Sequence, residues 1–270
     1  MARWLGMLSG PVEAAVDRQF SDGGTCRITI VGDSHAELFD CLSQRPLRLA
    51  DRRIVDANVV PVKAATIRGF GKRRSTLDVR RKSLGAIREN DDAVVFAYGQ
   101  VDIELGYFYR LHVKHEELAF DPFAAELAEN YTARLAALPL NAVPIVKGVN
   151  LSVLSWSRQK AISFTCQILD TDDTADRRAL EMELAEKFPS GEEIDRRHRL
   201  FNTHLKAAAA KHGLAYFDFL EATADRRTGH IKRRWVPRTF DHHARRKKSL
   251  YRIVRRSLAG ALVEAVPKVS

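Results

Sequence analysis

Residues 27–39 read RITIVGDSHAELF, and this stretch decides the fold. Its first five residues are mostly apolar and β-branched, which is typical of a buried parallel strand. Gly32-Asp33-Ser34 interrupts the run, and the residues from His35 onward are compatible with a helix. The stretch therefore predicts a strand, a tight turn and a helix, with Ser34 presented at the carboxyl end of the strand.

Similar strand-and-helix units recur along the chain. Further strands are predicted at 59–62, 93–98, 144–149 and 214–219, and helices at 75–90, 121–138, 194–212 and 245–265. Pro61 confines the second strand to an edge or a strand end, Asp121 and Pro122 mark a helix start, and Gly213 is a helix C-cap. The alternation predicts an α/β fold, a three-layer α/β/α sandwich around a mostly parallel sheet.

Length and composition suit one main domain. The chain has 270 residues, of which 45% are hydrophobic and 29% are charged, a balance typical of a globular protein with a sizeable core. We expect an N-terminal leader or cap over 1–24 and one domain over 25–270. Within that domain, 151–190 is expected to be a flexible or substrate-covering insertion, and 245–265 a basic terminal helix.

Cysteine usage and the absence of long apolar runs bear on the compartment. Three widely separated cysteines without a CxxC pair argue against a disulfide framework and for a reducing environment. The apolar patch near the N-terminus is short and interrupted by glycine and proline, unlike a signal peptide. No run approaches the roughly 18 apolar residues that a membrane span needs. We therefore expect a cytoplasmic protein with no transmembrane segment.

The charge is strongly positive and clustered. The net charge is +10, concentrated in 68–82 and 245–256, where it predicts a solvated face or a polyanion contact. Nucleic acid is not expected as a partner, because no nucleic-acid-binding motif accompanies the charge. The segment 245–266 also has an amphipathic pattern, which favours a helix packed on the sheet and leaves peripheral membrane contact by the basic tail as the alternative.

Three predicted strands end in polar turns that contain glycine. These turns are Gly32–Ser34, Gly99–Asp102 and Gly148–Asn150. Ligands of such sheets bind outside the carboxyl ends of the strands. A helix that begins directly after Ser34 would supply backbone N–H groups to a developing oxyanion beside the serine hydroxyl.

The order of these motifs resembles the SGNH (GDSL-like) hydrolases. ITIVGDSHAELF is similar to the first block of that family, whose serine is the nucleophile, and Gly69 stands where the second block has its oxyanion-hole glycine. YGQVDIEL, with Gly99–Asp102, resembles the third block, and 240–243 takes the place of the last block, which supplies the catalytic histidine and its aspartate. The resemblance spans 27–244 and implies a flavodoxin-like sheet.

Two positions depart from the family pattern. Val101 replaces the asparagine of the third block, so Gln100 is the candidate oxyanion donor in its place. Phe240 stands three residues before His243, where the family has aspartate, so Asp241 becomes the candidate partner of the imidazole. His242 is the alternative base. The non-catalytic alternatives are an N-cap role for Ser34 and a surface position for His243.

The resemblance implies a serine esterase or deacetylase that forms an acyl-enzyme. Ser34 would be the nucleophile, His243 the base and Asp241 its partner, with the oxyanion bound by the N–H groups of Ser34 and Gly69 and by Gln100. The other predicted substrate contacts are Asp33, His35, Arg68, Gly99, Asp102 and His242.

The expected substrate is a small-molecule or glycan ester, and the basic segment 68–82 favours an anionic carbohydrate. The alternatives are a glycan O-acyltransferase and a catalytically silent module that binds a glycan or partner. We expect no cofactor. We also expect no metal, because His112 and His115 lack a carboxylate–histidine set at ligand spacing.

Overall fold

The computed structural model describes residues 24–72, 75–169, 174–239 and 241–267. Six strands form one sheet in the order β2-β3-β1-β4-β5-β6. Every pairing is parallel except that of β2 with β3. The strands are β1 (Thr25–Gly32), β2 (Leu47–Arg48), β3 (Ile54–Pro61), β4 (Ala93–Ala97), β5 (Val143–Lys147) and β6 (Ala215–Phe217).

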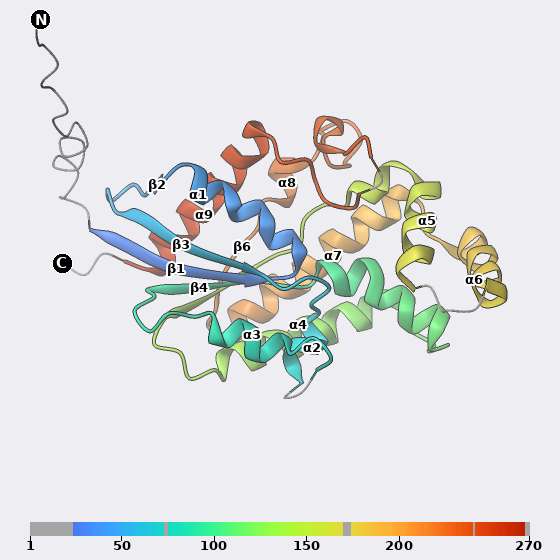
Figure 1. Cartoon of the computed structure of the whole chain (residues 1–270), viewed down its shortest axis with the longest axis horizontal. Helices are drawn as coiled ribbons and strands as arrows, with labels where there is room; N and C mark the ends of the chain where they lie inside the picture. Colours follow the sequence, from blue (N-terminus) through green and yellow to red (C-terminus); the bar gives the residue numbers. More distant parts are fainter. Residues whose placement is uncertain (1–23, 73–74, 170–173, 240, 268–270) are drawn as a thin grey trace, which may run out of the picture.

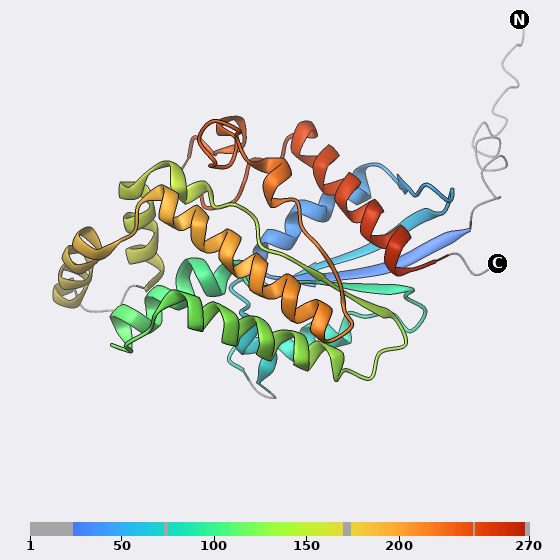
Figure 2. The same ribbon diagram turned by 180° about the vertical axis from the view of Figure 1, so that it is seen from behind.

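Helices cover both faces of this sheet (Figures 1 and 2). Val94 and Phe96 of β4 point into one core, and Ala93 and Val95 point into the other, as the alternation of side chains along a strand requires. The first core lies under α2 (Ile67–Gly71), α3 (Val79–Gly85), α4 (Phe120–Ala136) and α7 (Gly191–Lys211), and the second under η2 (Ser34–Asp40), α1 (Cys41–Gln44), α8 (Leu220–Thr223) and α9 (Lys248–Ala265). The predicted three-layer α/β/α sandwich is confirmed.

Most predicted elements are present, with shifted ends. The second strand is longer than predicted and begins at Ile54, while Pro61 is its last residue, where a missing N–H is tolerated. The helix predicted at 121–138 begins at Phe120, and its N-cap Ala119 makes no side-chain hydrogen bond, so Asp121 is not the cap. Gly213 has the positive φ of +68° expected after a helix end.

The segment 151–190 is mostly helical. It contains η5 (Val153–Trp156), α5 (Arg158–Leu169) and α6 (Thr174–Lys187). The strands in Figure 1 point toward the side of the molecule where α5 and α6 lie. This segment therefore lies beyond the carboxyl edge of the sheet, where a site is expected, and its status as an insertion stays a prediction.

The basic terminal helix packs on the sheet. Leu250, Val254 and Leu258 of α9 are almost completely buried in the second core, which accounts for the amphipathic pattern, and membrane contact by the basic face stays a prediction. No helix in the described ranges is long and apolar enough to cross a membrane. The predicted leader over 1–24 lies outside the described residues, apart from Gly24.

Candidate active site

Ser34 lies where β1 turns into the 3₁₀ helix η2. A Cβ atom on Gly32 would lie 2.4 Å from the carbonyl oxygen of Ala97, so only glycine lets β1 and β4 approach this closely. Asp33 then caps η2, because its carboxylate accepts the His35 N–H at 2.9 Å. The turn therefore presents Ser34 as the first residue of η2, at the carboxyl edge of the sheet.

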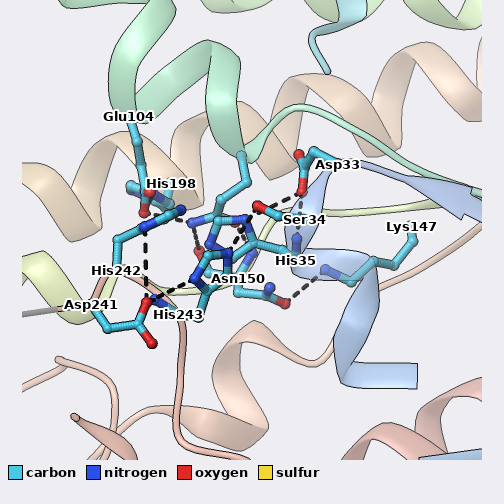
Figure 3. Close-up of polar contacts among 11 residues, drawn as sticks. Asp33, Ser34, His35, Glu104, Lys147, Asn150, His198, Asp241, His242 and His243 are labelled. Carbon is cyan, nitrogen blue, oxygen red and sulfur yellow. Dashed lines mark hydrogen bonds and ion pairs between the residues drawn. The ribbon is translucent and has the colours of Figure 1, made fainter. Parts of the chain in front are cut away.

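His243 contacts the hydroxyl of Ser34 from the far end of the chain. Its Nε2 lies 2.8 Å from Ser34 Oγ, and its Nδ1 lies 2.8 Å from Asp241 Oδ1 (Figure 3). A carboxylate only accepts hydrogen bonds, so Nδ1 carries the proton and Nε2 is left to accept the Ser34 proton. The three residues lie in the arrangement of a serine–histidine–aspartate triad.

Asp241 is held in its charged form. Burial raises the pKa of this carboxyl, but hydrogen bonds from the backbone N–H and the ring of His243 outweigh burial and lower it overall. An ionised Asp241 stabilises the imidazolium that forms when His243 takes a proton. Phe240, which replaces the aspartate of the family pattern, lies outside the described residues.

The loop that carries His243 is bound to the helix that carries Ser34. Arg246 forms ion pairs with Glu37 and with Asp40, the latter at 3.1 Å, and both carboxylates belong to η2. The Arg245 N–H donates to the Trp235 carbonyl at 2.7 Å. In the sequence, Arg246 belongs to a basic cluster, and its neighbours in the chain give no indication of these partners.

His242 has no hydrogen bond to Ser34 within the described residues, whereas His243 does. Its ring packs against Phe164, with centroids 4.5 Å apart, and against His35 at 5.1 Å. Burial lowers the pKa of His242 to about 4. Within the described ranges His243 is the ring bonded to Ser34 Oγ, which favours His243 over His242 as the base.

The predicted side-chain and glycine donors of the oxyanion hole are engaged elsewhere. The Gly69 N–H donates to Thr66 Oγ1 at 2.8 Å. Gln100 Nε2 donates to Glu104 at 2.7 Å and to the Asn150 carbonyl at 3.3 Å, and its Oε1 accepts the Asn150 N–H at 2.8 Å. These hydrogen bonds leave neither Gly69 nor Gln100 free to bind an oxyanion. The Ser34 N–H, by contrast, has no acceptor among the described residues.

Asn150, which follows β5, offers an unused donor at the same edge. Lys147 Nζ donates to Asn150 Oδ1 at 2.7 Å, and an ammonium has only donors, so this contact fixes which side of the amide carries the NH₂ group. Asn150 Nδ2 is buried and has no partner among the described residues. The sequence analysis noted the polar turn at Gly148–Asn150 without assigning this side chain, because its orientation depends on Lys147.

Three other predicted substrate contacts have structural partners. Asp102 Oδ2 accepts the Ile67 N–H at 2.7 Å at the start of α2, and burial raises the pKa of Asp102 to about 7. Gly99 adopts a φ of +118°, where a Cβ atom would press on the Phe201 ring. Arg68 lies over the Phe123 ring, and the hollows that it lines share no residue with the cavity beside Asp241.

A cavity of about 290 Å³ opens beside the triad. Asp241 lines it, together with Phe164, whose ring packs on His242. The remaining walls combine apolar and polar side chains, two of them cationic, and comprise Val153, Leu154, Trp156, Ser157, Lys160, Arg233, Val236, Pro237 and Thr239. The positive charge that lines this cavity therefore comes from Lys160 and Arg233 rather than from Arg68.

His35 joins the two histidines of the last block. Its ring is buried, with Nδ1 3.2 Å from Asp33 Oδ1. Burial lowers the pKa of His35, but the hydrogen bond and charge of Asp33 outweigh burial and raise it overall. One ring nitrogen from each of His35, His242 and His243 lies within 4.8 Å of the others, so these rings could hold a metal ion. His112, considered in the sequence, bonds instead to Glu183.

Comparison with known proteins gives similarity in structure alone. No family model matches the sequence, and no curated protein matches it. A GDSL-like lipase from Bacteroides thetaiotaomicron is 10% identical with a TM-score of 0.45, over 89% of each chain. An α/β hydrolase enzyme from the metagenome of Lake Arreo is 13% identical with a TM-score of 0.43, over 90% of this chain and 96% of the other.

The OSK domain of Drosophila Oskar is 12% identical with a TM-score of 0.45, over 86% of each chain. At such low identities, the chain is similar to these solved structures in fold.

Proposed function

We propose that this protein is a serine hydrolase that cleaves carboxylic esters through an acyl-enzyme. The observation that carries the proposal is the pair of 2.8 Å contacts that join Ser34 Oγ to His243 and His243 to Asp241. A serine is a weak nucleophile unless a base removes its proton, and this arrangement supplies the base and its partner.

The reaction would proceed in two halves. His243 Nε2 takes the proton as Ser34 Oγ attacks the ester carbonyl, and then returns it to the departing alcohol. Water, activated by the same imidazole, releases the acid and regenerates Ser34. The Ser34 N–H and the Nδ2 group of Asn150 are the donors proposed for the oxyanion, because neither has an acceptor among the described residues.

The substrate that we propose is an acylated, anionic carbohydrate. The cavity beside Asp241 combines the aromatic rings of Trp156 and Phe164 with the charges of Lys160 and Arg233. Such a lining suits a ligand with one apolar part and one anionic part. A glycan O-acyltransferase would use the same nucleophile, with a sugar hydroxyl in place of water.

Hydrolysis of p-nitrophenyl acetate tests the proposal. We expect acetate release by the wild type and none above background by Ser34→Ala, with Ser43→Ala as the control, since Ser43 lies on α1 and donates only to a backbone carbonyl. Release that requires an added sugar acceptor would indicate the transferase. Equal rates for wild type and Ser34→Ala would favour the alternative of a catalytically silent binding module. The hydrogen bonds that already occupy the Gly69 N–H and Gln100 Nε2 are the observation that supports this alternative.

A further inference from the structure

Three histidine rings meet beside Ser34, and their arrangement exceeds what a triad needs. The rings of His242 and His243 have centroids 3.8 Å apart, and those of His35 and His243 are 4.6 Å apart. One ring nitrogen from each lies within 4.8 Å of the others (Figure 3). The triad uses only His243, so His35 and His242 have no assigned part in it.

Two of the rings have the surroundings typical of metal-ligating histidines. His35 Nδ1 faces Asp33 at 3.2 Å, and His243 Nδ1 faces Asp241 at 2.8 Å. Metal-bound histidines commonly donate their other N–H to a carboxylate, which fixes the tautomer and leaves Nε2 as the ligand. In both residues the carboxylate is already in place.

The buried ring of His35 provides an independent observation that points to a ligand. Its side chain is 7% exposed, and its Nε2 atom is buried with no partner among the described residues. Buried polar atoms are nearly always hydrogen-bonded or ligated. A cation bound by the three rings would give this nitrogen a partner.

We infer that His35, His242 and His243 bind one divalent transition-metal ion of the Zn²⁺ class, and that the bound ion shuts off the serine. Imidazole ligands favour Zn²⁺, Cu²⁺, Ni²⁺ or Co²⁺ over Mg²⁺ and Ca²⁺. The ion would take the lone pair of His243 Nε2, which then cannot accept the Ser34 proton. The metal site stands on geometry, whereas its inhibitory effect rests on the proposed function.

Zn²⁺ competition against a chromophoric chelator, on the full metal-free chain, tests the site without reference to activity. We expect one equivalent bound by wild type and by Ser34→Ala, and at least about 10-fold weaker binding by His35→Gln and by His242→Gln. The matched control is His204→Gln, because His204 lies on α7 and bonds to Asp121 instead. No stoichiometric binding, or wild-type affinity in both His35→Gln and His242→Gln, would overturn the site.

Fluorophosphonate labelling then tests the inhibition. Labelling of each protein is compared with its own metal-free rate: that of wild type should fall when one equivalent of Zn²⁺ is added and return with chelator, while that of His35→Gln should fall by a smaller factor at the same Zn²⁺ concentration. Labelling unchanged by bound Zn²⁺ would overturn the inhibitory effect. If the metal-free protein is never labelled, the proposed function fails, while the chelator titration still decides the metal site.

Discussion

At the carboxyl edge of the sheet, the polar groups around Ser34 and those around Gln100 differ in their hydrogen-bond partners. Around Ser34 and His243, the functional groups face one another, and although Ser34 is buried, 31% of the His243 side chain is exposed. Around Gln100 and Asp102, the equivalent polar groups are buried and bonded within the protein. The two regions therefore differ in which polar groups have partners: Gln100 and Asp102 are bonded within the protein, whereas Asn150 Nδ2 has no partner among the described residues, and we propose Asn150 as the oxyanion donor.

Replacing His243 by glutamine should have the largest effect. Loss of the base leaves Ser34 protonated, and we expect kcat/KM for p-nitrophenyl acetate to fall by about 10³-fold or more. The protein should still unfold at the wild-type urea midpoint, because His243 lies in a partly exposed loop. His242→Gln is the comparison variant: a loss as large as that of His243→Gln would transfer the role of base to His242.

Asn150→Asp tests whether the donor role lies outside the third block. The change keeps an oxygen for Lys147 and removes the Nδ2 donor, so we expect kcat to fall by about 10² to 10³-fold. Gln100→Ala should lower kcat by less than about 10-fold, although it removes the partner of the Asn150 N–H and lowers stability. The reverse order of the two effects would restore the oxyanion role to Gln100.

Asp102 should affect stability more than activity. Burial raises its pKa to about 7 from the ordinary aspartate value of 3.8, so between these pH values the folded protein holds a proton that the unfolded chain releases. The contribution of the protonated Asp102 carboxyl to the free energy of unfolding is complete below pH 3.8 and is lost as the pH rises through about 7. Between pH 5 and pH 8, this group alone should cost about 2 to 3 kcal/mol of unfolding free energy.

Urea unfolding at both pH values measures that difference. Asp102→Asn should remove most of the pH dependence, because the amide keeps an acceptor for the Ile67 N–H and does not titrate. Its kcat should stay within about 10-fold of wild type. An unchanged pH dependence would mean that Asp102 is not the group that titrates. A far larger fall in kcat would return Asp102 to the substrate site.

Arg246→Ala should give the smallest effect. Its ion pairs with Glu37 and Asp40 are partly exposed, and such pairs typically contribute about 1 kcal/mol or less. We expect at most about a 10-fold loss of kcat/KM in Arg246→Ala, because the loop that carries His243 is less well held. High salt, which screens the same ion pairs, should lower kcat/KM of the wild type in the same direction. Arg245→Ala is the control, and an equal loss in that variant would mean that general charge, rather than contact with η2, is responsible.

The features predicted from sequence were those that short stretches determine. The turn at Gly32–Ser34 depends on residues adjacent in the chain, and the family pattern supplied the pairing of Ser34 with His243 across 209 residues. The hydrogen bonding of Gln100 could not be predicted in the same way, since its partner Asn150 lies 50 residues away in the chain. Which buried polar groups find partners is a property of packing, and local pattern does not encode it.

The same reason explains the histidine cluster. His112 and His115 are close in the sequence, as metal ligands often are, whereas the rings that converge come from the two ends of the domain. His35 adjoins Ser34 and His242 adjoins His243 in the sequence, so bringing Ser34 to His243 also brings these neighbours together. Tertiary proximity of two motifs therefore carries information about the residues next to them.

The central claim is that Ser34 is an activated nucleophile, and identification of the residue labelled by a fluorophosphonate probe tests it most directly. Peptide mass spectrometry of the labelled, metal-free protein should place the adduct on Ser34, with no labelling of Ser34→Ala and slow labelling of His243→Gln. An adduct on another serine, or labelling that persists in Ser34→Ala, would contradict the account.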